Sequence, residues 1–175
     1  KARQDCGIRS IFNMLGPLTN PASASCQVLG VYAPELTELF AMALKLFGVI
    51  KALVVHGHDS MDEVTTTDLT RVTELSDGMI KTYDLDPLSY FEEYADPKDL
   101  LGGDVPKNAA ITMAVLKGEP GPKQNIVLLN AGVGLVATGA APTIEKGIEL
   151  ARVSIESGAA LKKLEQLAAY TQENG

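Results

Sequence analysis

The chain has 175 residues, of which 46% are hydrophobic, and its formal net charge at pH 7 is -7. This length supports one domain with a sizeable buried core and is short for two ordinary domains. The negative charge argues against nucleic acids and anionic membranes as partners, because the long-range field repels polyanions. A local cationic pocket stays compatible with this charge.

Cysteine content and hydropathy indicate a cytoplasmic protein. Cys6 and Cys26 form neither a disulfide framework nor a CxxC spacing, which is typical of thiols in a reducing compartment. No apolar run approaches the roughly 20 residues of a membrane span, and we expect no signal peptide. The first residues resemble the middle of a helix, so we expect further sequence to precede Lys1.

The first half of the chain predicts a βαβ unit. Residues 34–47 form an amphipathic helical pattern, with Pro34 in the first turn and Gly48 as the stop. The apolar runs 26–32 and 51–57 on either side predict buried strands of a parallel sheet. The predicted apolar face of the helix comprises Leu36, Leu39, Phe40, Ala43, Leu44 and Phe47.

The second half predicts a hairpin and then helices. Residues 70–75 and 79–85 alternate apolar and polar side chains, which is typical of a half-exposed hairpin. The irregular stretch 86–104 is a surface loop or contains a short helix. Closing helices are predicted over 104–118, 122–137, 143–157 and 159–170. The resulting fold class is α/β, with a largely parallel sheet flanked by helices.

Carboxylates gather in the loop after the strand 51–57. Asp59, Asp62 and Glu63 follow the carboxyl end of this strand, where open α/β sheets bind ligands. Two neighbouring carboxylates suit Mg²⁺, which keeps several waters and takes further oxygens from phosphates. A solvated acidic turn is the alternative interpretation.

The same loop contains two histidines. His56 and His58 flank Gly57 and could supply two zinc ligands from one face. His56 ends an apolar strand, so a hydrogen-bonded structural histidine is the favoured interpretation.

A rigid turn and two arginines lie near the start of the chain. Gly16 and Pro17 belong to a tight loop, which ends a helix or forms a wall for a flat ligand. Arg3 and Arg9 would project to different sides of a helix, so one of them could bind a carboxylate through its planar guanidinium. The sequence contains no GxSxG, Walker or GxGxxG pattern, and LLGGD at 100–104 follows no predicted strand.

Four segments together resemble the carboxyl-terminal half of the anthranilate phosphoribosyltransferases. They are GIRSIFNMLGPLTNPA (7–22), ALVVHGHDSMDEVTTT (52–67), NIVLLNAGVGL (125–135) and SGAALKKLEQL (157–167), and the resemblance covers essentially the whole chain. It implies transfer of a phosphoribosyl group from phosphoribosyl pyrophosphate (PRPP) to anthranilate, with Mg²⁺ and release of pyrophosphate, in tryptophan biosynthesis. It also implies the larger domain of a nucleoside phosphorylase-like fold and a homodimeric full-length protein.

The resemblance assigns site residues and domain boundaries. Arg3 would hold the anthranilate carboxylate, Gly16 and Pro17 would line the anthranilate pocket, and Asp62 and Glu63 would bind Mg²⁺. No side chain of this chain receives a catalytic role. Residues 1–22 would be a remnant of a helical domain with its hinge, and residues 23–175 the α/β domain.

Two departures from the family pattern affect this interpretation. Ser60 stands where the family often has glycine, so the approach of the loop can differ slightly. The family's GTGGD phosphate loop and its histidine and asparagine pocket segment lie amino-terminal to the matched region, so we expect little or no activity from this chain alone. The alternatives are a pyrimidine nucleoside phosphorylase-like enzyme and a non-catalytic partner-binding domain.

Overall fold

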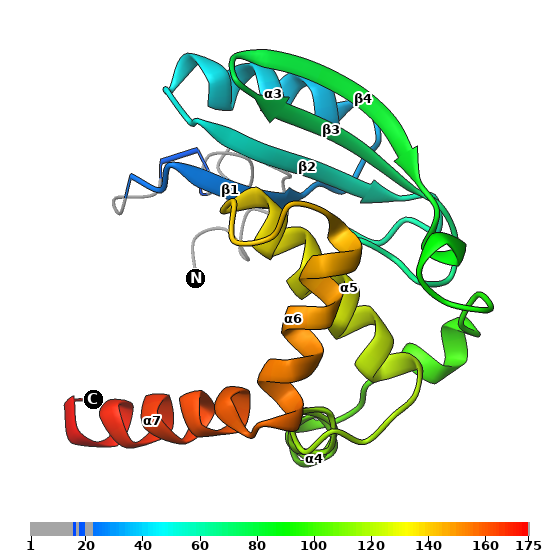
Figure 1. Cartoon of the computed structure of the whole chain (residues 1–175), viewed down its shortest axis with the longest axis vertical. Helices are drawn as coiled ribbons and strands as arrows, with labels where there is room; N and C mark the ends of the chain where they lie inside the picture. Colours follow the sequence, from blue (N-terminus) through cyan, green and yellow to red (C-terminus); the bar gives the residue numbers. More distant parts are fainter. Residues whose placement is uncertain (1–15, 17, 20–22, 175) are drawn as a thin grey trace, which may run out of the picture.

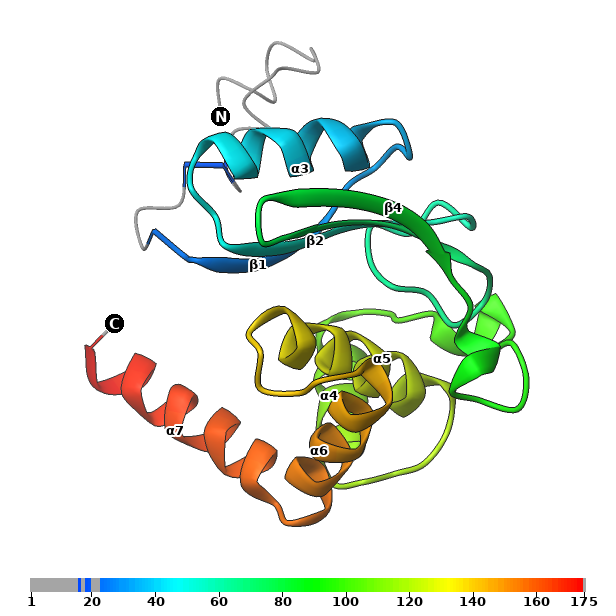
Figure 2. The same cartoon turned by 45° about the horizontal axis from the view of Figure 1, so that its top comes forward.

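The computed structural model describes residues 16, 18–19 and 23–174. A four-stranded sheet lies between helix α3 (Leu36–Leu46) on one face and helices α5 (Pro122–Ala137) and α6 (Ile144–Glu156) on the other (Figures 1 and 2). Helix α7 (Ala159–Asn174) follows α6 and extends to the left of α4 and α6 in both views.

The sheet is mixed. Its strands are hydrogen-bonded in the order β1 (Cys26–Gly30), β2 (Lys51–Gly57), β3 (Thr70–Ser76) and β4 (Met79–Leu85). β1 and β2 are parallel and α3 connects them, which confirms the predicted βαβ unit. The β2–β3 and β3–β4 pairs are antiparallel. The α/β class is confirmed, but a largely parallel sheet is wrong for the part of the chain that the structure describes.

The predicted hairpin accounts for one of the two antiparallel pairs, β3 with β4. Asp77 and Gly78 join β3 to β4 with φ angles of 52° and 73°, the left-handed pair that suits a two-residue hairpin turn. β2 is almost continuously buried because helices cover both faces of the sheet, and not because both of its neighbours are parallel. A continuous apolar run therefore indicates two covered faces without determining the direction of the neighbouring strand.

The helices after the hairpin follow the predicted segments closely. Helix α4 (Val105–Leu116) begins after Asp104, whose Oδ1 accepts a hydrogen bond from the Lys107 N–H at 3.0 Å, as expected of an N-cap. The irregular stretch before it contains two 3₁₀ helices, η1 (Pro87–Ser89) and η2 (Pro97–Leu100). Among the helices described, none is long and apolar enough to cross a membrane.

Alternate residues of β2 divide the core into two layers. Leu53 and Val55 point toward α5 and α6, where they pack with Leu128 and Leu129. Ala52 and Val54 point the other way and pack with α3, in a cluster that includes Phe40, Ala41 and Leu44. Each fully buried Leu or Val contributes about 1.5–3 kcal/mol of transfer free energy, so these layers hold the strand in place.

The buried face of α3 is rotated from the predicted one. Leu39 and Phe47 were expected in the core but are 51% and 66% exposed, whereas Thr37 and Ala41 are fully buried. Thr37 tolerates burial because its hydroxyl donates to the Pro34 carbonyl at 2.9 Å. The small residues let α3 approach the sheet closely.

Helices α5 and α6 cross where two glycines meet. A Cβ built on Gly147 would lie 2.5 Å from the carbonyl oxygen of Gly132, so the two backbones are in direct contact. A Cβ on Gly132 would lie 3.0 Å from the backbone nitrogen of Ile148. This contact explains why α5 has a glycine at position 132, because any side chain there would push the two helices apart.

Candidate functional site

The predicted acidic loop lies against the carboxyl ends of β1 and β2. The loop turns back tightly after β2, since the Gly57 N–H donates to the Met61 carbonyl at 2.8 Å and the Ser60 N–H to the Gly57 carbonyl at 2.9 Å. A Cβ on Gly30, the last residue of β1, would lie only 1.5 Å from the carbonyl oxygen of Asp62. The backbone of the acidic pair therefore lies directly on β1, at the end of a parallel pair where α/β proteins bind ligands.

Ser60 has the backbone conformation of a glycine. Its φ angle is 75°, in the left-handed region that costs most residues about 1–2 kcal/mol. This gives a physical reason for the glycine that the family often has at the position. The turn is nevertheless formed, as the Ser60 hydrogen bond to Gly57 demonstrates.

Asp59 holds the loop together. Its carboxylate accepts hydrogen bonds from the Met61 N–H at 3.0 Å, from the Thr65 hydroxyl at 2.6 Å and from the Thr67 hydroxyl. Burial opposes its charge, but these donors outweigh that effect and keep the pKa of Asp59 below its usual value. Asp59 is therefore a structural carboxylate, and Asp62 and Glu63 are the pair left facing solvent.

The environment of Glu63 favours a cation. Partial desolvation raises the pKa of Glu63, and the negative charges of Asp62 and Asp59 raise it further. A divalent cation at the pair would relieve this repulsion. In the described part of the chain, no three or more His, Cys, Asp or Glu side chains lie together so that they could hold a metal ion. Two carboxylates fit Mg²⁺, which takes its other oxygens from water and phosphate.

The two histidines have different structural roles. His56 is buried and its Nδ1 lies 2.7 Å from the Val31 carbonyl oxygen, so Nδ1 carries the proton and donates. This confirms the prediction of a hydrogen-bonded structural histidine. His58 contacts Asp84 of β4 through Nε2 at 3.0 Å. The two side chains thus contact different parts of the fold.

Asn130 of α5 contacts the other side of the acidic loop. Its Oδ1 accepts from the Val64 N–H at 3.0 Å, and its Nδ2 donates to the Val64 carbonyl at 2.7 Å. The reasoning from sequence missed this residue. The available signal was the single amide in the otherwise apolar run IVLLNAGVGL (126–135), because a covered amide side chain needs a hydrogen-bonding partner.

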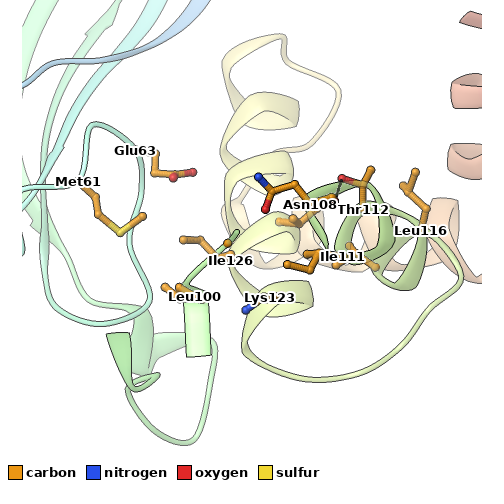
Figure 3. A pocket seen from close by; sticks show the side chains of 12 residues that line it. Met61, Glu63, Leu100, Asn108, Ile111, Thr112, Leu116, Lys123 and Ile126 are labelled. Carbon is orange, nitrogen blue, oxygen red and sulfur yellow. Dashed lines mark hydrogen bonds between the residues drawn. The ribbon is translucent and has the colours of Figure 1, made fainter. Parts of the chain in front are cut away.

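A cavity of about 390 Å³ lies beside Glu63. Figure 3 shows Met61 and Glu63 reaching toward it from the acidic loop, opposite side chains of α4 and α5. Most of the lining is apolar, with Asn108 and Lys123 among the polar residues. Both polar side chains also hydrogen-bond to nearby backbone. Asn108 accepts from the Gly103 N–H and donates to the Gly103 carbonyl, and Lys123 donates to the Asp99 carbonyl.

The predicted anthranilate wall lies mostly outside the described residues. Arg3 and Pro17 are not among them. Gly16 is exposed and its carbonyl accepts from the Thr19 N–H at 3.3 Å, which is a turn as expected. Leu18 lines a hollow with Ser25, just before β1 begins.

The Gly16 turn and the acidic pair share no cavity among those described. Leu18, two residues after Gly16, lines the hollow beside Ser25, whereas Glu63 lines the cavity beside α4 and α5.

These features define a class: an α/β domain with an open acidic site at the carboxyl ends of two parallel strands. The family model described as "Glycosyl transferase family, a/b domain" matches residues 1–161. The chain belongs to this family.

Relatives with similar sequences and structures support this assignment. The chain is 58% identical over 174 residues to an anthranilate phosphoribosyltransferase of Desulfatibacillum aliphaticivorans, covering 99% of this chain and 52% of the relative. The crystal structure of the anthranilate phosphoribosyltransferase of Thermus thermophilus is similar with a TM-score of 0.87 and 40% identity, over 97% of this chain and 50% of that one.

A third relative was solved with ligands. The anthranilate phosphoribosyltransferase of Saccharomyces cerevisiae in complex with PRPP and Mg has a TM-score of 0.82 and 32% identity, over 93% of this chain and 47% of that one. The chain thus spans about half the length of the relatives it matches. The resemblance inferred from the sequence is confirmed.

Proposed function

We propose that this chain is the α/β part of an anthranilate phosphoribosyltransferase and that Asp62 and Glu63 bind the Mg²⁺ that accompanies PRPP. The observation that carries the proposal is the exposed pair of carboxylates at the carboxyl ends of β1 and β2, in a chain whose relatives bear this name. Residues 1–22 would belong to a helical domain and hinge, and the full-length protein would be a cytoplasmic homodimer.

The proposed reaction joins the anthranilate nitrogen to the ribosyl carbon of PRPP. The bond from that carbon to the pyrophosphate oxygen breaks with its electron pair leaving on the pyrophosphate, and the nitrogen gives up one proton to water. Asp62 and Glu63 would hold Mg²⁺, and the ion would supply positive charge against the negative charge of the leaving pyrophosphate. Arg3, Gly16 and Pro17 would orient anthranilate so that the two reacting atoms meet.

Two observations favour metal binding over a merely solvated acidic turn. Asp59 supports the loop and leaves Asp62 and Glu63 exposed, and burial together with the neighbouring negative charges raises the pKa of Glu63. A solvated turn does not need a backbone fixed on both sides. This loop is fixed by Asp59 on one side and by Asn130 on the other.

The test is an assay of the chain extended to the length of its relatives, with anthranilate, PRPP and Mg²⁺. We expect phosphoribosyl transfer, which the double substitution Asp62→Asn and Glu63→Gln reduces by about 10²-fold in kcat/KM for PRPP. Glu92→Gln with Glu93→Gln is the control, because these are also adjacent exposed carboxylates but lie elsewhere. Unchanged Mg²⁺ dependence in the Asp62 and Glu63 variant contradicts the metal assignment.

Two further arms separate the alternatives. Turnover of a pyrimidine nucleoside with phosphate, and not of anthranilate with PRPP, would establish the nucleoside phosphorylase alternative. The isolated 175 residues should have little or no transferase activity, since they span about half of each relative. Turnover close to that of the longer protein would contradict this expectation.

A further inference from the structure

We propose that Asn130 is a positioning residue for the acidic pair: by holding the backbone of Val64, it fixes the direction in which Asp62 and Glu63 present their carboxylates. This inference rests on the proposed function, because it assumes that the pair binds a divalent cation. Beyond that function, the direction of the two carboxylates depends on Asn130, a neutral side chain of α5 that is 66 residues from Val64 in sequence.

The Asn130 amide bonds both backbone groups of Val64, as a neighbouring strand would. Asn130 accepts from the N–H of Val64 at 3.0 Å and donates to the carbonyl of the same residue at 2.7 Å. Its second N–H donates to the Ile126 carbonyl of its own helix at 3.0 Å, which fixes the orientation of the amide. All three distances are those of good hydrogen bonds. The amide thus satisfies both polar groups of a residue that no strand neighbour pairs within the described sheet.

The acidic loop is held on both sides of the pair. On the amino-terminal side, the Met61 N–H donates to Asp59 and the Met61 carbonyl accepts from the Gly57 N–H. On the carboxyl-terminal side, Asn130 holds Val64. Asp62 and Glu63 are the two residues between these fixed points, so the backbone that sets the direction of their side chains is held at both ends.

The chemistry of position 130 requires an amide. Val64 is fully buried, so an apolar residue at 130 would leave its N–H and C=O without the partners that burial requires. An aspartate would keep the acceptor for the Val64 N–H, but it would lose the donor and add a negative charge near an already repulsive pair. Residues that orient metal ligands typically change metal affinity by about 10–100-fold when they are substituted.

The experiment uses the full-length enzyme and its apparent Mg²⁺ half-saturation concentration at fixed PRPP. We expect Asn130→Asp and Asn130→Ala to raise this concentration by about 10-fold or more, with the KM for anthranilate changed by less than about 2-fold. Mn²⁺ as a paramagnetic probe, added with PRPP without anthranilate, should bind more weakly to the same degree. The control is Asn125→Ala, because Asn125 is on the same helix but lines another hollow, with Tyr90 and Phe91.

The outcomes separate this inference from the proposed function. If the unsubstituted enzyme neither binds Mn²⁺ with PRPP nor transfers the phosphoribosyl group, the proposed function is wrong and this inference falls with it. If that enzyme is active and Asn130→Asp has an unchanged Mg²⁺ half-saturation, the positioning role alone is refuted, even where the variant unfolds at lower urea. Asn130→Asp retains one of the two bonds to Val64 and so supplies a folded variant if Asn130→Ala fails to fold.

Discussion

Replacing Gly30 by alanine should displace the acidic pair. Gly30 ends β1, and its backbone touches the backbone of Asp62 without an intervening side chain. Its φ angle is not in the left-handed region, so alanine can adopt the local conformation and the effect comes from the added methyl group alone.

The size of the displacement follows from one distance. The added Cβ would lie 1.5 Å from the Asp62 carbonyl oxygen, and real Cβ contacts essentially never fall below 3.0 Å. The two groups must therefore separate by at least about 1.5 Å. The oxygen belongs to backbone that is hydrogen-bonded on both sides, so it cannot swing aside as a flexible side chain would. A misplacement of about 1 Å at a reacting site can lower the rate by about 10²-fold.

The assay is steady-state kinetics of full-length Gly30→Ala with PRPP as the varied substrate, at several Mg²⁺ concentrations. We expect kcat/KM for PRPP to fall by about 10²-fold and higher Mg²⁺ to restore part of the loss. Gly134→Ala is the matched control, because nothing lies within 4 Å of a Cβ at this helical position and alanine favours helix by about 1 kcal/mol. A folded Gly30→Ala enzyme with unchanged kinetics would refute the reasoning.

Two predictions concern stability. Ser60→Gly should stabilise the fold by about 0.5–1 kcal/mol in urea unfolding, because it removes a left-handed cost that exceeds the greater chain entropy of glycine; a loss of stability would contradict this. Burial first, and then the charge and hydrogen bond of Glu74, raise the pKa of Tyr83 above its ordinary value. The folded state therefore holds this proton more tightly than the unfolded state, so the contribution is complete below pH ~10 and is lost as pH rises further. Tyr83→Phe should unfold with a weaker pH dependence between about pH 9 and 11, and equal slopes would exclude this origin.

The order of elements was predictable because its signals are local. Periodicity, Pro34, Asp104 and the glycine stops identify helices whose ends differ little from those observed. The hairpin was predictable for the same reason, since Asp77 and Gly78 supply the turn. The direction of strand pairing across the whole sheet is a tertiary property, and buried strands carry the same apolar run in either direction.

The exposed position of the acidic pair was predictable, but its support was not. Asp62 and Glu63 follow the carboxyl end of an apolar strand, where open α/β sheets bind ligands, and a metal site there stays a prediction. The division of labour between Asp59 and the pair depends on the hydroxyls of Thr65 and Thr67, and a list of three nearby carboxylates cannot distinguish them. Asn130 lies on a different element, so its role needed the fold.

The contact of Gly132 with Gly147 has a consequence at a distance. Side chains between two helices normally accommodate small displacements by changing rotamer. Where α5 and α6 cross, backbone contacts backbone, so no side chain can adjust. Gly132 is two residues from Asn130, so a displacement of α6 at this contact would also move the part of α5 that carries the amide holding the acidic loop. The solvent-facing surface of α6 is therefore a place from which the acidic end of the sheet could be adjusted without touching it.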